Sequence, residues 1–212
     1  MESEAIKIFD EYRNEVGVAT RKKAHQVGHW HETFHCWFIN REEGMNYIYF
    51  QLRSETKKDF PNLLDITAAG HILANENVSD GIREVKEELG IALSDHELVS
   101  LGVIKDCIIS KDFIDREFCN VFLYESNKKM NEYKLQREEV SGIFKVPFDE
   151  FCELWLGDVE EITVEGFQVS YDGHKVVLNM NVNKSNFVPH ENAYYERLLA
   201  LIRKRFEIYS NQ

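Results

Sequence analysis

The segment from Val78 to Gly90, VSDGIREVKEELG, most restricts how this chain can fold. Its apolar residues are separated by four, three and four positions, and they are Val78, Ile82, Val85 and Leu89. This spacing places them along one stripe of an amphipathic α-helix. Asn77, with Asp80 three residues later, is a suitable N-cap, and Gly90 can end the helix with a positive φ angle. The stripe must be buried, so the sequence predicts another layer packed against this helix.

Short apolar stretches on both sides of this segment are typical of β-strands. They cover residues 5–10, 16–21, 34–40, 47–53 and 63–71 before the helix, and 98–109 and 118–125 after it. Strands with few helices between them indicate a mixed β-sheet packed between helices. We find no repeat or linker that divides the chain, so we expect a single domain over residues 1–212, with its core at about 5–157.

The C-terminal part of the chain adds three expected elements. Residues 146–156 indicate a short helix, and residues 162–182 alternate on either side of an Asp-Gly pair, which is a strong hairpin signal. A final helix follows Pro189, with a stripe formed by Tyr194, Leu198, Ile202 and Phe206. We expect the hairpin and final helix, within residues 158–212, either to pack over the pocket or to form a homodimer contact.

The charge balance of the chain limits its partners. Across 212 residues the formal net charge is −12, and no large Lys/Arg cluster opposes it. Such a charge repels a phosphate backbone, so we expect no binding of a nucleic-acid polymer. A small anionic substrate is compatible with it when a divalent cation lies between the substrate and the acidic residues.

Cysteine usage and hydropathy indicate the compartment. Cys36, Cys107, Cys119 and Cys152 are scattered without a C-x-x-C pair, which favours free thiols in a reducing environment. No segment approaches the roughly 20 apolar residues of a membrane span, and the N-terminus MESEAIKIFDEYRN has no apolar core. We therefore expect a cytoplasmic protein without membrane contact.

Three glutamates, Glu84, Glu87 and Glu88, share the face of the predicted helix opposite its apolar stripe. Each like-charge pair at these spacings costs roughly a few tenths of a kcal/mol, which water can tolerate, so a solvated acidic face is one interpretation. The other is that the carboxylates collect a hard cation such as Mg²⁺, which takes oxygen ligands and is completed by substrate phosphates. A cation there would remove the repulsion and activate water for hydrolysis of a diphosphate.

The segment GHILANENVSDGIREVKEELGI, residues 70–91, resembles the Nudix box, Gly-x5-Glu-x7-Arg-Glu-U-x-Glu-Glu-x-Gly-U, in which U is a bulky aliphatic residue. The matching positions are Gly70, Glu76, Arg83, Glu84, Val85, Glu87, Glu88, Gly90 and Ile91. One departure is that six residues, rather than seven, separate Glu76 from Arg83. The junction between the loop and the helix must therefore be one residue shorter.

This resemblance implies an α/β fold of the Nudix type, an α/β/α sandwich with a mixed β-sheet, extended here by the C-terminal β-hairpin and helix. It implies that Glu84, Glu87 and Glu88 are ligands of Mg²⁺ or Mn²⁺ and that one of them doubles as general base. Gly70 would offer its backbone carbonyl to the metal, and Arg83 would orient the carboxylates.

Four histidines, His25, His29, His31 and His35, fall within eleven residues. The last three have the same parity, so an extended strand would point them to one side. A second metal site is one interpretation. The alternative is polar edge-strand histidines, since the spacing matches no recognised zinc motif and no paired cysteines accompany it.

The wider pattern is similar to the isopentenyl-diphosphate isomerase-like branch of the Nudix superfamily. Its marks are histidines before a strand with Trp37, the pair Gly70-His71 that opens the box, and acidic residues on a later strand, Asp115 and Glu117. The resemblance makes Glu117 a candidate metal ligand or base, and a surface strand residue is the alternative. Isomerases of this branch carry a catalytic cysteine directly before Gly-His, where this chain has Ala69.

Isomerisation needs an acid and a base on opposite faces of the substrate, and the missing cysteine removes one of them. Hydrolysis of a diphosphate needs only metal-activated water and the carboxylates, which remain. We therefore expect a hydrolase of a small-molecule diphosphate. An isomerase with a substitute for the cysteine, and a non-catalytic sensor of a diphosphate metabolite, are the alternatives.

Two further residues are candidates for substrate contacts. Arg53 lies where related proteins often carry a basic residue that meets a phosphate, and a structural salt bridge is the alternative. Glu138, or its neighbour Glu139, follows the third strand group, near the place where some Nudix enzymes carry an acidic residue, and a solvated turn is the alternative.

Overall fold

The computed structural model describes residues 3–111 and 113–210, whose strands form one eleven-stranded sheet. The elements are, in chain order, β1 (Ala5–Phe9), β2 (Glu15–Thr20), α1 (Arg21–Val27), β3 (Trp30–Glu42), β4 (Met45–Arg53), β5 (Leu64–Ile66), β6 (Ala68–His71), the 3-10 helix η1 (Val78–Ile82), α2 (Arg83–Leu89), η2 (Asp95–Glu97), β7 (Leu98–Ile109), β8 (Ile114–Glu125), β9 (Val140–Pro147), α3 (Phe148–Leu156), β10 (Ile162–Val169), β11 (Lys175–Val182), η3 (Lys184–Asn186) and α4 (Asn192–Ser210). The four cysteines are unpaired, as predicted. Within the described ranges, no helix combines the length and apolarity needed to cross a membrane.

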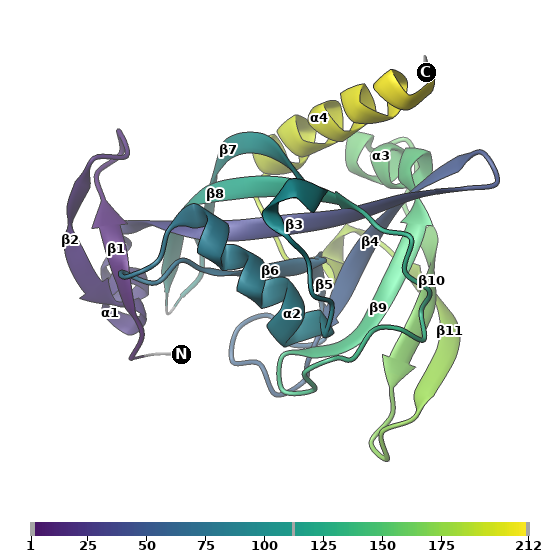
Figure 1. Ribbon diagram of the computed structural model, residues 1–212, viewed down its shortest axis with the longest axis horizontal. Coiled ribbons are helices and arrows are strands. Elements are labelled where there is room, and N and C mark those ends of the chain that lie inside the picture. The colour runs from purple at the N-terminus through teal and green to yellow at the C-terminus, as the bar shows by residue number, and fades with distance from the viewer. Residues whose placement is uncertain (1–2, 112, 211–212) are drawn as a thin grey trace.

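Strand β3 is the axis of the sheet and runs through the middle of the molecule (Figure 1). It pairs antiparallel with β1, β4 and β6 and parallel with β8. Beyond β4 the sheet continues through β9, β10 and β11. The sheet is therefore mixed, as the sequence predicts.

The side chains of β3 alternate between two apolar cores, because successive residues of a strand point to opposite faces. Trp37 and Ile39 belong to a core that includes buried residues of α3 and α4. Phe34 and Phe38 belong to the other core, which includes the apolar stripe of α2. Figure 1 shows α2 on one side of β3 and α3 and α4 on the other. This arrangement confirms the predicted α/β/α sandwich with its C-terminal hairpin and helix.

The box segment is a helix in two parts, not the single helix predicted from Val78 onward. Its first turn is η1, and the α-helical part begins only at Arg83. Within η1, a Cβ added to Gly81 would lie 2.5 Å from the Cβ of Phe34, so this turn packs directly on β3. A 3-10 helix rises about 2.0 Å per residue, against about 1.5 Å in an α-helix. The tighter winding thus spans the junction with fewer residues, in agreement with the shortened spacing of the box.

Both ends of the segment match the prediction. The Asp80 carboxylate accepts the backbone N–H of Asn77 at 2.7 Å, and Gly90 has a φ angle of 70°. A Cβ at Gly90 would also lie 2.7 Å from the carbonyl oxygen of Lys134. Glycine is therefore required at this position for its conformation and for its small size.

Helix α1 is absent from the elements expected from the sequence. It begins after Thr20, whose Oγ1 accepts the Lys23 N–H at 3.3 Å, and it ends at Gly28 with a φ angle of 77°. Ala24 is its one buried residue. The helix has no apolar stripe, so its sequence carries no helical periodicity to detect.

This helix changes the expected placement of the histidines. His25 lies on α1, His29 precedes β3, and His31 and His35 lie on β3. The expectation that the last three share one face of a strand is therefore correct for His31 and His35 and wrong for His29.

The C-terminal elements pack on the apolar core that contains Trp37. The stripe predicted for the last helix is buried, with Tyr194, Leu198 and Ile202 at 0% exposure and Phe206 at 7%. The indole of Trp155 on α3 stacks on Tyr195 of α4 at 3.8 Å between ring centroids. The hairpin β10–β11 ends the sheet, and a homodimer contact through it stays a prediction.

The substitution Leu198→Ala should lower the free energy of unfolding by roughly 2–5 kcal/mol, because it leaves a cavity between α4 and the sheet. Urea unfolding followed by fluorescence and by circular dichroism measures it. We expect both probes to report one transition, as a single domain over residues 1–212 requires. Lys204→Ala on the exposed side of α4 is the control and should change little. Two separate transitions would contradict the single domain.

Candidate functional site

A cavity of about 370 Å³ opens among β3, β4, β6, β8, α2 and the segment that precedes α4. Of the residues predicted for the site, seven line it: Arg53, Gly70, Arg83, Glu84, Glu87, Glu88 and Glu117. Glu138 lies instead on an adjoining recess that shares Lys57 and Glu139 with the cavity. The fold therefore brings the box and the later strand to one place.

Arg83 connects the loop of the box to its helix. Its Nε donates to Glu76 Oε1 at 2.6 Å, and its Nη1 donates to Glu84 Oε1 at 2.6 Å and to Glu87 Oε2 at 3.2 Å. Its Nη2 donates to the carbonyl oxygen of His71 at 3.1 Å. Glu76 thus reaches Arg83 despite the shorter spacing, and the guanidinium holds the two carboxylates of α2 in place.

Two carboxylates of α2 are crowded against β6. A Cβ at Gly70 would lie 2.1 Å from Glu84 Oε1, and Glu88 Oε2 accepts the backbone N–H of Ala69 at 3.2 Å. Burial, and next the negative charge of Glu87, raise the pKa of Glu84 to about 7 despite the opposing charge of Arg83. Burial, with the charge of Glu84, raises the pKa of Glu88 well above its usual value. A cation at this position would favour the ionised form of both groups.

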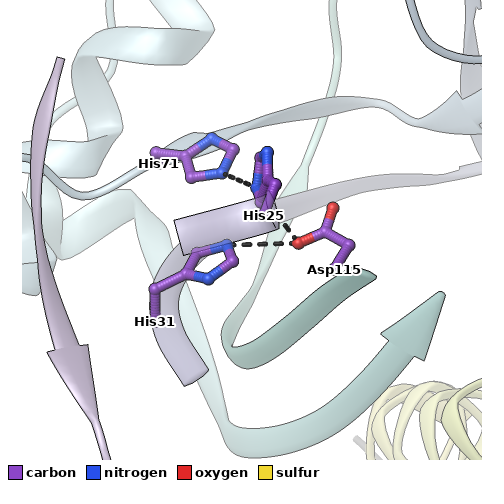
Figure 2. A group of neighbouring side chains, drawn as sticks. All are labelled: His25, His31, His71 and Asp115. Carbon is purple, nitrogen blue, oxygen red and sulfur yellow. Dashed lines mark hydrogen bonds and ion pairs between the residues drawn. The ribbon is translucent and has the colours of Figure 1, made fainter. Parts of the chain in front are cut away.

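A second group of ligating atoms lies next to the box, and we call it the histidine–carboxylate cluster: His25, His31, His71 and Asp115 (Figure 2). One ligand atom of each residue lies within 4.8 Å of all the others. The Nε2 atoms of His25 and His31 lie 3.3 Å and 3.2 Å from Asp115 Oδ1, and the Nε2 atoms of His25 and His71 are 3.1 Å apart. These side chains come from α1, β3, β6 and β8 and point toward one another.

The donor atoms of this cluster fit a metal ion. His31 Nε2 and Asp115 Oδ1 are buried and make no hydrogen bond, although they lie 3.2 Å apart. His31 Nδ1 lies 3.0 Å from the carbonyl oxygen of His29. A proton on Nδ1 bonded to that carbonyl leaves the lone pair of Nε2 directed into the cluster, as in metal-bound histidines.

The charges around the cluster also favour a cation. Burial would raise the pKa of Asp115, but the close approach and charges of His25 and His31 hold it well below its usual value. Burial, and next the positive charge of Arg21, lowers the pKa of His71 well below its usual value. A neutral imidazole beside an ionised carboxylate is the combination that a divalent metal needs.

Glu117 lies between the cluster and a buried histidine. Its Oε1 is 4.0 Å from His31 Nε2, and its Oε2 is 3.2 Å from His35 Nε2. The parallel pairing of β3 with β8 places His31 opposite Glu117 in the register. The carboxylate is therefore within reach of a metal bound at the cluster.

Each of the three guanidinium nitrogens of Arg53 donates one hydrogen bond within the wall of the cavity. It donates to Asp65 Oδ2 and to the carbonyl oxygen of Asp59, both at 2.8 Å, and to the carbonyl oxygen of Phe60 at 3.0 Å. This is the geometry of a structural salt bridge, the alternative considered for this residue. Its contact with a phosphate stays a prediction.

His190 lies between two buried carboxylates in the floor of the cavity. Its Nδ1 is 2.6 Å from Asp106 Oδ2 and its Nε2 is 3.0 Å from Asp65 Oδ1. Burial alone would lower the pKa of His190, but the hydrogen bonds to Asp106 and Asp65 outweigh it and raise the pKa to about 10. The imidazolium therefore fastens the segment before α4 to β5 and β7.

Sequence patterns indicated these further residues only in part. His71 and Asp115 were part of the pattern shared with the isomerase-like branch. Their contact with His25, however, depends on α1 and on the pairing of β3 with β6 and β8. His190 has no motif around it. The one local signal was a single histidine beside Pro189, next to the predicted start of the last helix.

No family model matches the chain. An uncharacterised Nudix hydrolase of Clostridium acetobutylicum is 40% identical over 199 residues, which cover 94% of this chain and 97% of that protein. The chain belongs to the Nudix hydrolase superfamily.

This Nudix hydrolase is also similar to an isomerase in sequence and to a solved structure in fold. An isopentenyl-diphosphate Delta-isomerase of Photorhabdus laumondii is 28% identical over 166 residues, which cover 72% of this chain and 90% of the isomerase. A crystal structure of a Deinococcus radiodurans protein superposes with a TM-score of 0.53 at 21% identity, over 70% of this chain and 86% of that one. The second similarity shows the shared fold.

We expect His31→Gln to lower the affinity of the metal-free protein for Mn²⁺ by more than roughly 10-fold, since loss of even an outer partner of a metal site costs that much. Titration calorimetry measures the affinity. His29→Gln is the matched control, because it keeps the carbonyl that faces His31 and removes a side chain outside the cluster. Equal affinities of the two variants would contradict a metal site in the cluster.

The stability of the protein should fall between pH 6.5 and pH 10 through His190. The folded state keeps the proton of His190 up to about pH 10, whereas the unfolded chain releases it near pH 6.5. The stabilisation is therefore complete below pH 6.5 and is lost as the pH approaches 10. Urea unfolding across this range should show a steeper decline for the wild type than for His190→Gln. The exposed His174→Gln should follow the wild type, and parallel curves for all three would refute the prediction.

Proposed function

We propose that this Nudix hydrolase cleaves a diphosphate linkage in a small-molecule substrate by attack of water, with Mg²⁺ or Mn²⁺ as cofactor. The observation that carries the proposal is that one cavity is lined by the box carboxylates and by three members of the histidine–carboxylate cluster, His25, His71 and Asp115. Each group alone is open to another interpretation. Together they give two groups of metal donors in a space large enough for a diphosphate.

The two donor sets suit different cations. The carboxylates of Glu84, Glu87 and Glu88, with the Gly70 carbonyl, are oxygen donors of the type that Mg²⁺ prefers. The cluster and Glu117 combine imidazole nitrogen with carboxylate oxygen, a set that suits Mn²⁺ or another transition metal. When bound, such cations polarise a phosphoryl oxygen and lower the pKa of water.

The residues of the chain would hold the substrate and move the proton. Arg21 and Lys57 on the cavity wall can contact phosphate oxygens, and Arg83 keeps Glu84 and Glu87 oriented. Glu117 is our candidate for accepting a proton from water if it is not itself a ligand. Arg53 and Glu138 remain proposed substrate contacts, Arg53 on the wall and Glu138 in the adjoining recess.

The size of the cavity supports a small-molecule substrate. About 370 Å³ lies within the range of roughly 300–1,000 Å³ that is usual for such sites. The net charge of −12 opposes binding of a nucleic-acid polymer. The lining of the cavity holds more carboxylates than basic side chains, so a compact anionic group such as a diphosphate would bind there together with divalent cations.

An isoprenoid-diphosphate isomerase is the second candidate, because one relative of this chain bears that name and the cluster matches the pattern of the branch. The site favours it less. Ala69 stands at the cysteine position, and the thiol nearest to Glu117, Cys119, has 0% exposure and a pKa that burial raises well above its usual value. Interconversion of the two isoprenyl diphosphates by the purified protein would reverse the order of the candidates.

Glu87→Gln should abolish Mg²⁺-dependent turnover and leave the fold intact, because the side chain of Glu87 is 53% exposed and makes few structural contacts. The assay screens nucleoside diphosphate derivatives, isoprenyl diphosphates and other diphosphate metabolites with Mg²⁺ and with Mn²⁺, and measures the phosphomonoester and phosphate products by chromatography. Glu196→Gln on the exposed face of α4 is the matched control.

A Glu87→Gln protein as active as the wild type would overturn the assignment of this ligand. Binding of a diphosphate by calorimetry, without release of a phosphomonoester or phosphate with any metal, would favour the non-catalytic sensor.

A further inference from the structure

Two hydrogen bonds and one ion-pair contact form a chain from α4 to Glu117. The Nε1 of Trp37 donates to the hydroxyl oxygen of Tyr194 at 3.0 Å, and this hydroxyl lies 2.9 Å from His35 Nδ1. His35 Nε2 in turn lies 3.2 Å from Glu117 Oε2. Trp37 and Tyr194 have 0% exposure and His35 has 2%, so water does not compete for these groups.

The chemistry of the donors sets the direction of the chain. An indole N–H can only donate, so the Tyr194 oxygen accepts from Trp37 and its own proton is free to be donated. Burial raises the pKa of Tyr194 well above its usual value, so the hydroxyl keeps that proton. Donation to His35 Nδ1 satisfies both groups and leaves the imidazole proton on Nε2, facing Glu117.

The opposite tautomer would leave a buried group unsatisfied. With its proton on Nδ1, His35 would donate to a hydroxyl that already accepts from Trp37. The Tyr194 proton would then need another acceptor, and the contacts of the described residues offer none. The Nε2 of His35 would also present a lone pair to the carboxylate of Glu117. An unpaired buried donor costs about 1–3 kcal/mol.

The same Nε2 faces a second acceptor, Thr33 Oγ1, at 3.2 Å. Glu117 Oε2 also accepts from the thiol of Cys119 at 3.5 Å. These contacts occupy Oε2 and leave Oε1 on the side of His31 and the cluster. The buried contacts thereby hold one carboxylate oxygen of Glu117 in place, while the other oxygen faces the metal-ligating atoms.

The start of α4 is fastened independently of Tyr194. The backbone N–H of Glu191 donates to Asp106 Oδ1 at 2.9 Å, beside the His190 pair, and the Val188 N–H donates to the Leu64 carbonyl oxygen at 2.9 Å. The ring of His190 stacks on Tyr194 at 5.0 Å between centroids. The position of the Tyr194 hydroxyl is thus set by contacts on both sides.

We propose that Tyr194 is a positioning residue of the active site: its hydroxyl holds His35 in the tautomer with the proton on Nε2, and this proton orients Glu117 toward the histidine–carboxylate cluster. The C-terminal helix is therefore a functional part of the site. The inference rests on the proposed function in one respect, since it takes the cluster and Glu117 to hold a divalent cation.

The experiment compares Tyr194→Phe with Tyr195→Phe. The first removes only the hydroxyl that faces His35. The second removes an equally buried hydroxyl, which donates to the Val188 carbonyl oxygen at 3.3 Å. This hydroxyl takes no part in the contacts that link Trp37 to Glu117. Nitrogen chemical shifts of histidine-labelled, metal-free protein report the tautomer of His35, with His35→Gln for assignment. Calorimetry with Mn²⁺ alone reports the affinity of the site.

We expect the Nε2-protonated tautomer in the wild type and in Tyr195→Phe, and a mixture of tautomers in Tyr194→Phe. We expect Tyr194→Phe to bind Mn²⁺ roughly 10- to 100-fold more weakly than Tyr195→Phe, as for other outer partners of metal sites. The Nδ1-protonated tautomer in the wild type, or equal Mn²⁺ affinities of the two variants, would overturn the proposal.

The two proposals fail in distinguishable ways. If the wild type binds Mn²⁺ but hydrolyses no diphosphate, only the proposed function is overturned. The tautomer and affinity comparisons then still decide the role of Tyr194. A wild type that binds no Mn²⁺ overturns the metal-orienting role of Tyr194 together with the metal site. If Tyr194→Phe does not fold, the tautomer of the wild type decides.

Discussion

Burial penalises a carboxylate that has neither a positive partner nor a proton, and this constraint shapes the whole cavity. Glu84 and Glu88 are held against β6 with one arginine between the box carboxylates. Asp115 is buried beside histidines whose donor atoms are not all hydrogen-bonded. In both groups of residues, the protons and basic side chains of the protein satisfy only some of the metal-ligating atoms. The remaining atoms are able to bind metal ions.

The sheet makes this arrangement rigid. On β3, His31, Thr33 and His35 continue the same face as Trp37 and Ile39, so one strand face changes from polar at the site to apolar in the core. The parallel pairing with β8 aligns Glu117 with His31 across 86 residues of sequence. A site built on strands that also form the core can hold donor atoms in place without a bound ligand.

Local pattern was sufficient to predict the box helix, the strands around it, the hairpin and the stripe of α4. Each of these has a periodicity or a turn signal that depends on neighbouring residues alone. The helix α1 has a single buried residue and so gave no pattern. The 3-10 turn of η1 arises from the contact of Gly81 with Phe34, which is a tertiary effect.

The residues of the candidate site likewise divide into those that a local pattern predicts and those that depend on long-range pairing. The glutamates of α2 and Arg83 could be placed from spacing, because i, i+3 and i+4 positions share a face. The resemblance to the isomerase-like branch named Glu117. The cluster needed the register of β3 with β6 and β8, and the roles of His190 and Tyr194 needed the path of the C-terminal segment beneath the cavity. Long-range pairing of this kind leaves no short motif in the sequence.

A crystal structure of the protein soaked in Mn²⁺, with anomalous diffraction data, tests the central claim most directly. We expect an anomalous peak within coordination distance of His25, His31, His71 and Asp115, with Glu117 Oε1 turned toward it. A peak confined to the glutamates of α2, or none in the cavity, would contradict the claim that the histidine–carboxylate cluster is a metal site.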